Sequence, residues 1–245
     1  MKKIVATIEA RMTSSRLPGK PLLKVKGYTM IEYLVNRLRH VPSIDDIILA
    51  TTTNVEDDNL VKIAKKINVN VFRGSEHNVM QRVIQAASSI NGDLIVQITA
   101  DCPIIDPEII EESIRMYMSN NVDYVSNTIL RCYPDGMDTQ VYSLKTLKNS
   151  ASMTSDPLDQ EHVSLHIRNN PKIFKHLHLM APVKLFWPSL GLTLDEYSDY
   201  LLIKTIIENL HKKDTIFSCL DIINFLKKNP QFLKLNINVK RKGNN

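Results

Sequence analysis

Short apolar runs alternate with longer segments of helical periodicity through the first half of the chain, and no other feature limits the fold as strongly. The runs that predict strands are residues 4–10, 46–51, 70–72 and 93–99. Apolar residues recur three and four positions apart in the segments that predict helices, which are 28–40, 56–67, 78–90 and 107–118. Strand–helix alternation at this spacing predicts a largely parallel sheet that is covered by helices on both faces.

The pattern becomes less regular after a short strand at residues 123–126. In the remaining chain we predict strands at 137–142 and 190–194 and helices at 159–168, 197–210 and 219–227. No repeat, low-complexity tract or linker separates these segments. We therefore predict one domain over residues 1–245, with a small antiparallel, substrate-binding lobe inserted or appended at about 126–190.

Composition excludes several classes of protein. The chain has 245 residues, of which 43% are hydrophobic and 23% are charged, as in ordinary globular proteins. No apolar run approaches the roughly 20 residues that span a bilayer, so we expect no membrane partner. The three cysteines, Cys102, Cys132 and Cys219, are scattered and lack C-x-x-C spacing. This argues against a disulfide framework and against a zinc site, and it favours buried, reduced thiols in the cytoplasm.

The formal net charge is +5, and part of the positive charge is concentrated in residues 11–26. Cations that cluster in one loop favour a local anion site over a nucleic-acid surface. Aromatic residues are not interleaved with these cations as they are in single-strand binders, so nucleic acid is not an expected partner. A second basic run, residues 240–242, is predicted to be a solvated end of the chain.

A basic loop follows the first predicted strand. Residues 10–20 read Ala-Arg-Met-Thr-Ser-Ser-Arg-Leu-Pro-Gly-Lys, which combines small hydroxyl side chains with two arginines and a lysine. Backbone N–H groups, hydroxyls and cations are the groups that bind a triphosphate. The loop is neither a P-loop nor a Rossmann glycine motif, because both glycine patterns are absent. We predict a phosphate site here, and a solvated basic turn is the alternative.

Two aspartates follow predicted strands. Asp101 comes after strand 93–99, and Asp195 comes after strand 190–194. A carboxylate at a strand end can hold Mg²⁺, which bridges nucleotide phosphates. Each aspartate has an alternative role as a helix cap. Because ligands bind beyond the carboxyl ends of the strands in such sheets, we expect the basic loop, the segment from Arg73 onward and Asp101 to gather at one edge of the sheet.

Several of these segments resemble one known family. Residues 8–24 resemble the opening signature of the cytidylyltransferases related to CMP-Kdo synthetase and acylneuraminate cytidylyltransferase, and the resemblance is closest to the spore-coat polysaccharide biosynthesis protein F group. Further motifs of that group are matched at residues 72–82, 99–103, 133–141 and 161–168. The sequence departs from the group's pattern at Gln81, Gln140 and residues 196–198.

The resemblance implies a Rossmann-like, GT-A-like α/β nucleotidyltransferase fold, a three-layer sandwich with a mainly parallel sheet. Residues 1–125 would bind CTP, residues 126–190 would bind the acceptor, and residues 191–245 would supply the second metal ligand and the C-terminal helices. The implied reaction is Mg²⁺-dependent transfer of CMP from CTP to an acidic sugar or a phosphorylated acceptor, with release of pyrophosphate, in surface polysaccharide or glycoconjugate biosynthesis. A homodimer is the assembly that the resemblance implies.

The resemblance also implies roles for particular residues. The expected catalytic residues are Arg11, Arg16, Lys20 and Asp101. The expected nucleotide contacts come from Ala10, Arg11, Ser14, Ser15, Arg16, Lys20, Arg73, Ser75, Arg82, Thr99 and Ala100. The expected acceptor contacts come from Asp138, Gln140, His162 and Arg168. The expected Mg²⁺ ligands are Asp101 and Asp195.

Two other functions stay open from the sequence. A nucleotide-sugar-dependent glycosyltransferase would need a D-x-D-type metal pair, and the acidic pairs at residues 57–58 and 156–159 do not follow predicted strands. A non-catalytic nucleotide-binding module would bind CTP without turnover. Zinc is not expected, because His162 and His166, which we predict on one helix face, lack the H-E-x-x-H pattern.

Overall fold

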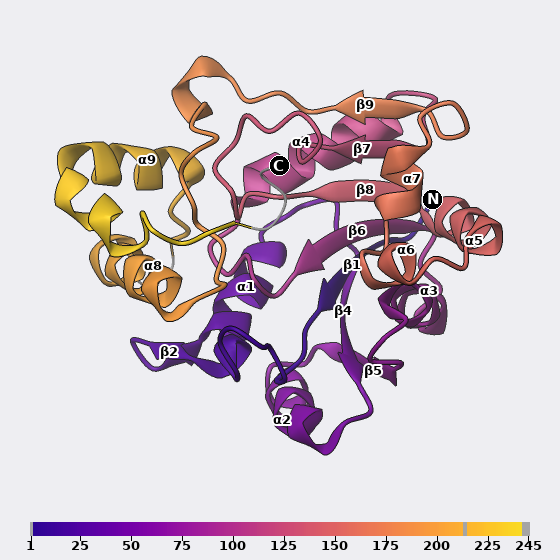
Figure 1. Cartoon of the computed structure of the whole chain (residues 1–245), viewed down its shortest axis with the longest axis horizontal. Coiled ribbons are helices and arrows are strands. Elements are labelled where there is room, and N and C mark those ends of the chain that lie inside the picture. Colours follow the sequence, from indigo (N-terminus) through magenta and orange to yellow (C-terminus); the bar gives the residue numbers. More distant parts are fainter. Residues whose placement is uncertain (1, 213–214, 242–245) are drawn as a thin grey trace.

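The computed structural model describes residues 2–212 and 215–241, and a seven-stranded sheet in the order β5-β4-β1-β6-β8-β7-β9 lies at its centre (Figure 1). The parallel part of the sheet consists of β1 (Ile4–Glu9), β4 (Asp46–Thr52), β5 (Asn70–Gly74) and β6 (Leu94–Thr99). The remaining strands are β7 (Tyr124–Ser126), β8 (Gln140–Ser143) and β9 (His176–His178). β8 runs antiparallel to β6 and β7, and β7 runs parallel to β9.

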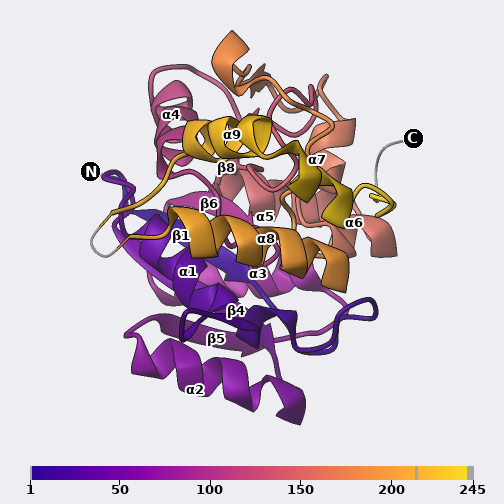
Figure 2. The ribbon, with the colours of Figure 1, turned by 90° about the vertical axis from the view of Figure 1, so that its left-hand side faces the viewer.

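Helices cover both faces of the sheet. Successive residues of a strand point to opposite faces, so the apolar residues of each strand lie on both sides of the sheet. In β1, Ile4, Ala6 and Ile8 pack into one core, whereas Val5 packs into another. The first core is covered by α1 (Met30–Leu38), α2 (Asp58–Lys66), α4 (Pro107–Met118), α8 (Tyr197–Leu210) and α9 (Cys219–Lys228). In Figure 2, α8 and α9 lie toward the viewer, in front of the sheet.

The opposite face is covered by α3 (Val79–Ser89), α5 (Leu144–Met153) and α7 (Leu165–Asn169), and α6 (Pro157–Glu161) lies against α3. This three-layer arrangement confirms the predicted α/β fold class. The separate two-stranded sheet is the hairpin of β2 (Lys24–Val25) and β3 (Tyr28–Thr29). Its turn residues, Lys26 and Gly27, have φ values of 48° and 88°, as a two-residue hairpin turn requires.

The structure differs from several predictions for the second half of the chain. The predicted helix 159–168 is two helices, α6 and α7, because Val163 between them has a φ of 51° in the left-handed region. His162 and His166 therefore do not share one helix face. The predicted strand 190–194 makes only one isolated bridge, between Gly191 and Asp135, because its backbone pairs with loops. Helix α5 and strand β9 were not predicted, and β8 lies between β6 and β7 in the main sheet.

The state of the cysteines agrees with the composition. All three cysteines are free and buried, as predicted. Within residues 2–212 and 215–241, no helix has the length and apolar character that crossing a membrane requires.

Candidate active site

A cavity of about 480 Å³ lies where β1 and β6 end. Its lining includes twelve residues that the sequence predicted for the site, which are Ala10, Arg11, Ser14, Ser15, Arg16, Lys20, Arg82, Thr99, Ala100, Asp101, His162 and Asp195. These residues come from segments far apart in the sequence. The parallel topology brings residues 10–20 and 99–101 together, because the loops that follow β1 and β6 leave the sheet at the same edge.

Residues 10–20, which we call the cationic loop, are fixed to the end of β4 by one buried aspartate. Asp57 is fully buried and accepts the N–H of Met12 at 2.7 Å and the hydroxyl of Thr51 at 2.8 Å. Burial opposes ionisation of Asp57, but hydrogen bonds from Thr52, Met12 and Thr51 outweigh it and hold its pKa below the usual value. Gly19 closes the loop with a φ of 73°, a conformation that favours glycine, and donates its N–H to the Met12 carbonyl.

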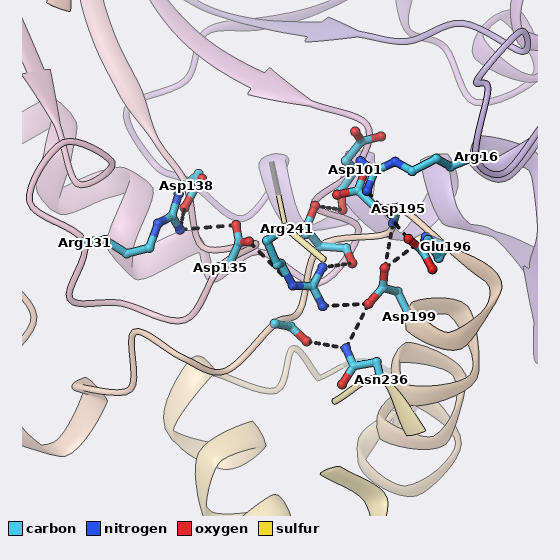
Figure 3. A network of polar contacts seen from close by, with 12 residues as sticks. Arg16, Asp101, Arg131, Asp135, Asp138, Asp195, Glu196, Asp199, Asn236 and Arg241 are labelled. Carbon is cyan, nitrogen blue, oxygen red and sulfur yellow. Dashed lines mark hydrogen bonds and ion pairs between the residues drawn. The ribbon is translucent and has the colours of Figure 1, made fainter. Parts of the chain in front are cut away.

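Lys20 is nearly buried and joins the two predicted metal ligands. Its side chain is 9% exposed, and Nζ lies 2.7 Å from Asp101 Oδ1 and 3.4 Å from Asp195 Oδ1. Arg16 Nη2 lies 2.8 Å from the same Asp195 oxygen. Figure 3 shows Arg16, Asp101 and Asp195 pointing toward one another. The loop that follows β1 and the two aspartates therefore meet at one point.

Asp195 faces these cations because other residues cap the helix that follows it. Glu196 is the N-cap of α8, and Asp199 accepts the N–H groups of Asp195 and Glu196 at 3.1 and 2.9 Å. The alternative role of Asp195 as the cap is thus taken by its neighbours. The preceding backbone is held against the β6 loop, since Leu194 donates its N–H to the Asp101 carbonyl at 2.7 Å.

The carboxylate oxygens of Asp101 and Asp195 are suited to bind a divalent cation together with a nucleotide. Burial raises the pKa of Asp101, and the adjacent Lys20 ammonium opposes that rise. Within the described ranges, no group of three or more His, Cys, Asp or Glu side chains is arranged to hold a metal. Mg²⁺ commonly takes one or two carboxylates and completes its shell with water and substrate phosphates, so Asp101 and Asp195 could hold it together with a triphosphate.

Glu9 also lines the cavity, and the sequence did not predict it for the site. Glu9, the last residue of β1, accepts the side-chain amide of Gln97 at 2.9 Å, and Gln97 in turn accepts the Tyr142 hydroxyl at 2.7 Å. Burial raises the pKa of Glu9 to about 7, although the Gln97 hydrogen bond and the charge of Arg82 oppose the rise. The only sequence signal was an acidic residue at the end of an apolar strand.

The comparisons with known proteins identify the family. The sequence model of the cytidylyltransferase family matches residues 5–228. This chain is a member of the cytidylyltransferase family. It is 31% identical to the spore coat polysaccharide biosynthesis protein SpsF of Bacillus subtilis over 94% of this chain and 96% of that protein. The enzyme is a CTP-dependent nucleotidyltransferase.

Solved structures agree with this membership. A cytidylyltransferase from Leptospira borgpetersenii superposes with a TM-score of 0.91 at 31% identity, over 98% of this chain and all of that one. A CMP-2-keto-3-deoxy-manno-octonic acid synthetase, solved in complex with CTP, superposes with a TM-score of 0.63 at 16% identity, over 84% of this chain and 99% of that one. The second similarity concerns the fold alone.

Two residues expected to contact the nucleotide lie outside the cavity of this cytidylyltransferase. The Arg73 guanidinium is engaged elsewhere: it donates to the Thr52 and Asn54 carbonyls at 2.8 and 2.7 Å and to Asp58 at 2.6 Å. Ser75 uses its hydroxyl to accept the N–H of Asn78 at 3.0 Å, just before α3. Arg82 does line the cavity, where it is 3% exposed and donates to the Ser75 and Glu76 carbonyls.

Three of the four expected acceptor contacts also lie outside the cavity. Asp138 is held by Arg131 through two contacts of 3.1 Å. Gln140 accepts the hydroxyls of Tyr124 and Ser164 through one oxygen. Arg168 does not line the cavity, and its Nε is buried without a hydrogen-bond partner. Only His162 reaches the cavity, from the junction of α6 and α7.

Replacement of Glu9 by glutamine should change how stability depends on pH. The folded wild-type protein keeps the Glu9 proton up to about pH 7, whereas the unfolded chain loses it near pH 4.5. Its free energy of unfolding should therefore fall by up to about 3 kcal/mol as the pH rises between these values. Glu9→Gln should lack this fall, and denaturation at pH 5 and pH 8 measures it. Glu56→Gln, at an exposed glutamate, is the control. Parallel curves for wild type and Glu9→Gln would contradict the prediction.

Proposed function

We propose that this cytidylyltransferase transfers CMP from CTP to a small acidic acceptor and releases pyrophosphate, with Mg²⁺ as its cofactor. The observation that carries the proposal is the convergence of the cationic loop with Asp101 and Asp195 at one cavity. A triphosphate requires cations and a divalent metal at the same place. The acceptor would be an acidic sugar or a phosphorylated small molecule, and the similarity to SpsF supports a place in surface polysaccharide or glycoconjugate biosynthesis.

The reaction needs positioning and charge neutralisation more than covalent help from the protein. An acceptor oxygen attacks the α-phosphorus of CTP, the new O–P bond forms, and the bond from the α-phosphorus to the bridging oxygen breaks. Pyrophosphate departs with that oxygen, and a hydroxyl acceptor also gives its proton to water. Lys20, Arg16 and Arg11 would stabilise the departing charge. In the free enzyme they are paired with Asp101, Asp195 and Glu76, so nucleotide binding would exchange carboxylate partners for phosphates.

Asp101 and Asp195 would hold the Mg²⁺ ion. The ion would supply a positive charge beside the phosphate oxygens while pyrophosphate leaves. The two aspartates are the only predicted ligands. Both are paired with cations in the free enzyme, and these cations could pair with the phosphates of CTP instead.

We further propose that the enzyme is a homodimer in the cytoplasm, where CTP is supplied. Light scattering should give about twice the mass of one chain.

A screen of pyrophosphate release tests the proposed function. Each of the four ribonucleoside triphosphates is combined with Mg²⁺ and with a panel of acidic sugars and phosphorylated acceptors. We expect release only with CTP, and only with one chemical class of acceptor. Release that is equal for all four triphosphates would contradict the assignment to CTP. CTP binding without release for any acceptor would favour a non-catalytic module, and cleavage of a nucleotide sugar without pyrophosphate would favour a glycosyltransferase.

A further inference from the structure

The end of the described chain returns to the active-site side of the molecule. After α9 and a short 3-10 helix at Pro230–Leu235, the backbone runs back toward the segment that carries Asp195 (Figures 1 and 3). The sequence predicted a solvated basic run at residues 240–242; Lys240 is exposed, and residue 242 lies outside the described residues. Arg241 is not solvated: its side chain is only 10% exposed, and it contacts three parts of the chain.

Asp199 connects this end of the chain to the Asp195 backbone. The Asp199 side chain is fully buried, and its two oxygens serve different partners. Oδ1 accepts from Arg241 Nη2 at 2.7 Å and from the Asn236 side-chain amide at 2.8 Å. Oδ2 accepts the N–H groups of Asp195 and Glu196. One carboxylate therefore transmits the position of the C-terminal segment to the residue that faces Arg16 and Lys20.

Further contacts fix the stretch just before Asp195. Arg241 Nη1 lies 3.5 Å from the Thr193 carbonyl, and Arg241 Nε lies 3.8 Å from Asp135 Oδ2. Asn236 donates to the Gly191 carbonyl at 3.0 Å. A Cβ atom on Gly191 would overlap the Arg241 guanidinium, so glycine at this position allows the arginine to lie against the backbone.

Charge explains why the contact with Arg241 matters. Removing one member of a buried ion pair is strongly destabilising for the group that is left behind. Within the described residues, the ion pair of Asp199 is the one with Arg241. Without Arg241, we expect the Asp199 carboxylate to turn toward water and to release the N–H groups of Asp195 and Glu196.

We propose that Arg241 and Asn236 form a C-terminal clamp that positions Asp195 through Asp199, and that the end of the chain is thus part of the support of the active site. The clamp residues are positioning residues, because they reach the cavity only through Asp199 and the backbone. The effect of the clamp on the Mg²⁺ requirement rests on the proposed function, in which Asp195 is a metal ligand. Its effect on the position of the Asp195 backbone does not depend on that function.

The test compares Arg241→Gln with Lys240→Gln, which removes the same charge from an exposed neighbour. NMR hydrogen exchange of the Asp195 and Glu196 amides is measured in both variants without nucleotide. Loss of a group that supports a metal ligand typically lowers metal affinity by about 10- to 100-fold. We expect faster exchange and a roughly 10-fold higher Mg²⁺ concentration for half-maximal pyrophosphate release in Arg241→Gln only. Arg241→Lys, which keeps the charge, should restore part of both properties.

The outcomes separate the clamp from the proposed function. Faster exchange with an unchanged Mg²⁺ requirement would support the clamp and contradict the role of Asp195 in metal binding. Unchanged exchange and an unchanged Mg²⁺ requirement, even with a lower melting temperature, would overturn the clamp and leave Arg241 a purely structural role. If Arg241→Gln does not fold, Asn236→Ala removes two hydrogen bonds without removing a charge. It should shift both readouts in the same direction, and no shift there would also overturn the proposal.

Discussion

Replacement of Asp101 by asparagine should reduce CTP-dependent pyrophosphate release by about a thousandfold and leave the fold intact. An amide keeps the shape of the side chain but removes the negative charge that a divalent cation requires. Asp101 also pairs with Lys20 at 2.7 Å, so the variant changes both the proposed metal site and the position of the ammonium. Single-turnover assays over a range of Mg²⁺ concentrations measure the loss.

Stability and a control variant make this prediction specific. Burial raises the pKa of Asp101, and Lys20 keeps Asp195 as a partner in the variant, so removal of the Asp101 charge should not lower the melting temperature at neutral pH. Asp93→Asn changes the same residue type just before β6 begins, at an exposed position, and should retain full activity. Near-normal turnover by Asp101→Asn would remove this residue from the mechanism.

Replacement of Lys20 by methionine should have opposite effects on two ligands. CTP affinity should fall by about 100-fold, because a charge-assisted contact with phosphate is lost. Binding of a divalent cation to the nucleotide-free enzyme should become tighter, because the ammonium that lies beside Asp101 and Asp195 is gone. Calorimetric titration with CTP, and separately with Mn²⁺ as a probe, measures the two changes.

The same substitution at an exposed lysine nearby provides the control. Lys24 belongs to β2, is exposed and does not line the cavity, so Lys24→Met should bind both ligands like the wild type. An unchanged CTP affinity in Lys20→Met would contradict the assignment of the cationic loop to phosphates. A weaker affinity for Mn²⁺ would contradict the competition between the ammonium and the metal.

The sequence was sufficient for the parts of the fold that local patterns determine. The apolar runs of β1, β4 and β6 and the helical periods between them predicted the parallel sheet. The break at Val163 was not predictable, because its left-handed backbone opposes the preference of a β-branched residue. The stretch 190–194 has the composition of a strand, but its hydrogen-bond partners are loop residues, which periodicity does not reveal.

In the site, too, residues placed by the neighbouring sequence were predictable, and residues placed by contacts with distant segments were not. The cationic loop and Asp101 were predictable, since each directly follows a strand. The position of Arg73 was not, because its three partners lie between the end of β4 and the start of α2, where each nitrogen of the guanidinium donates to one of them. Arg241 was missed for a related reason: its partner Asp199 is 42 residues away, and a basic run near a chain end resembles a solvated tail.

The most direct test of the central claim is a crystal structure of the enzyme with CTP and Mg²⁺. We predict that the triphosphate lies along the cationic loop and that Lys20 turns from the carboxylates toward a phosphate. The metal should lie between the triphosphate and both Asp101 and Asp195. A triphosphate bound away from residues 10–20, or a metal that contacts neither aspartate, would contradict the account.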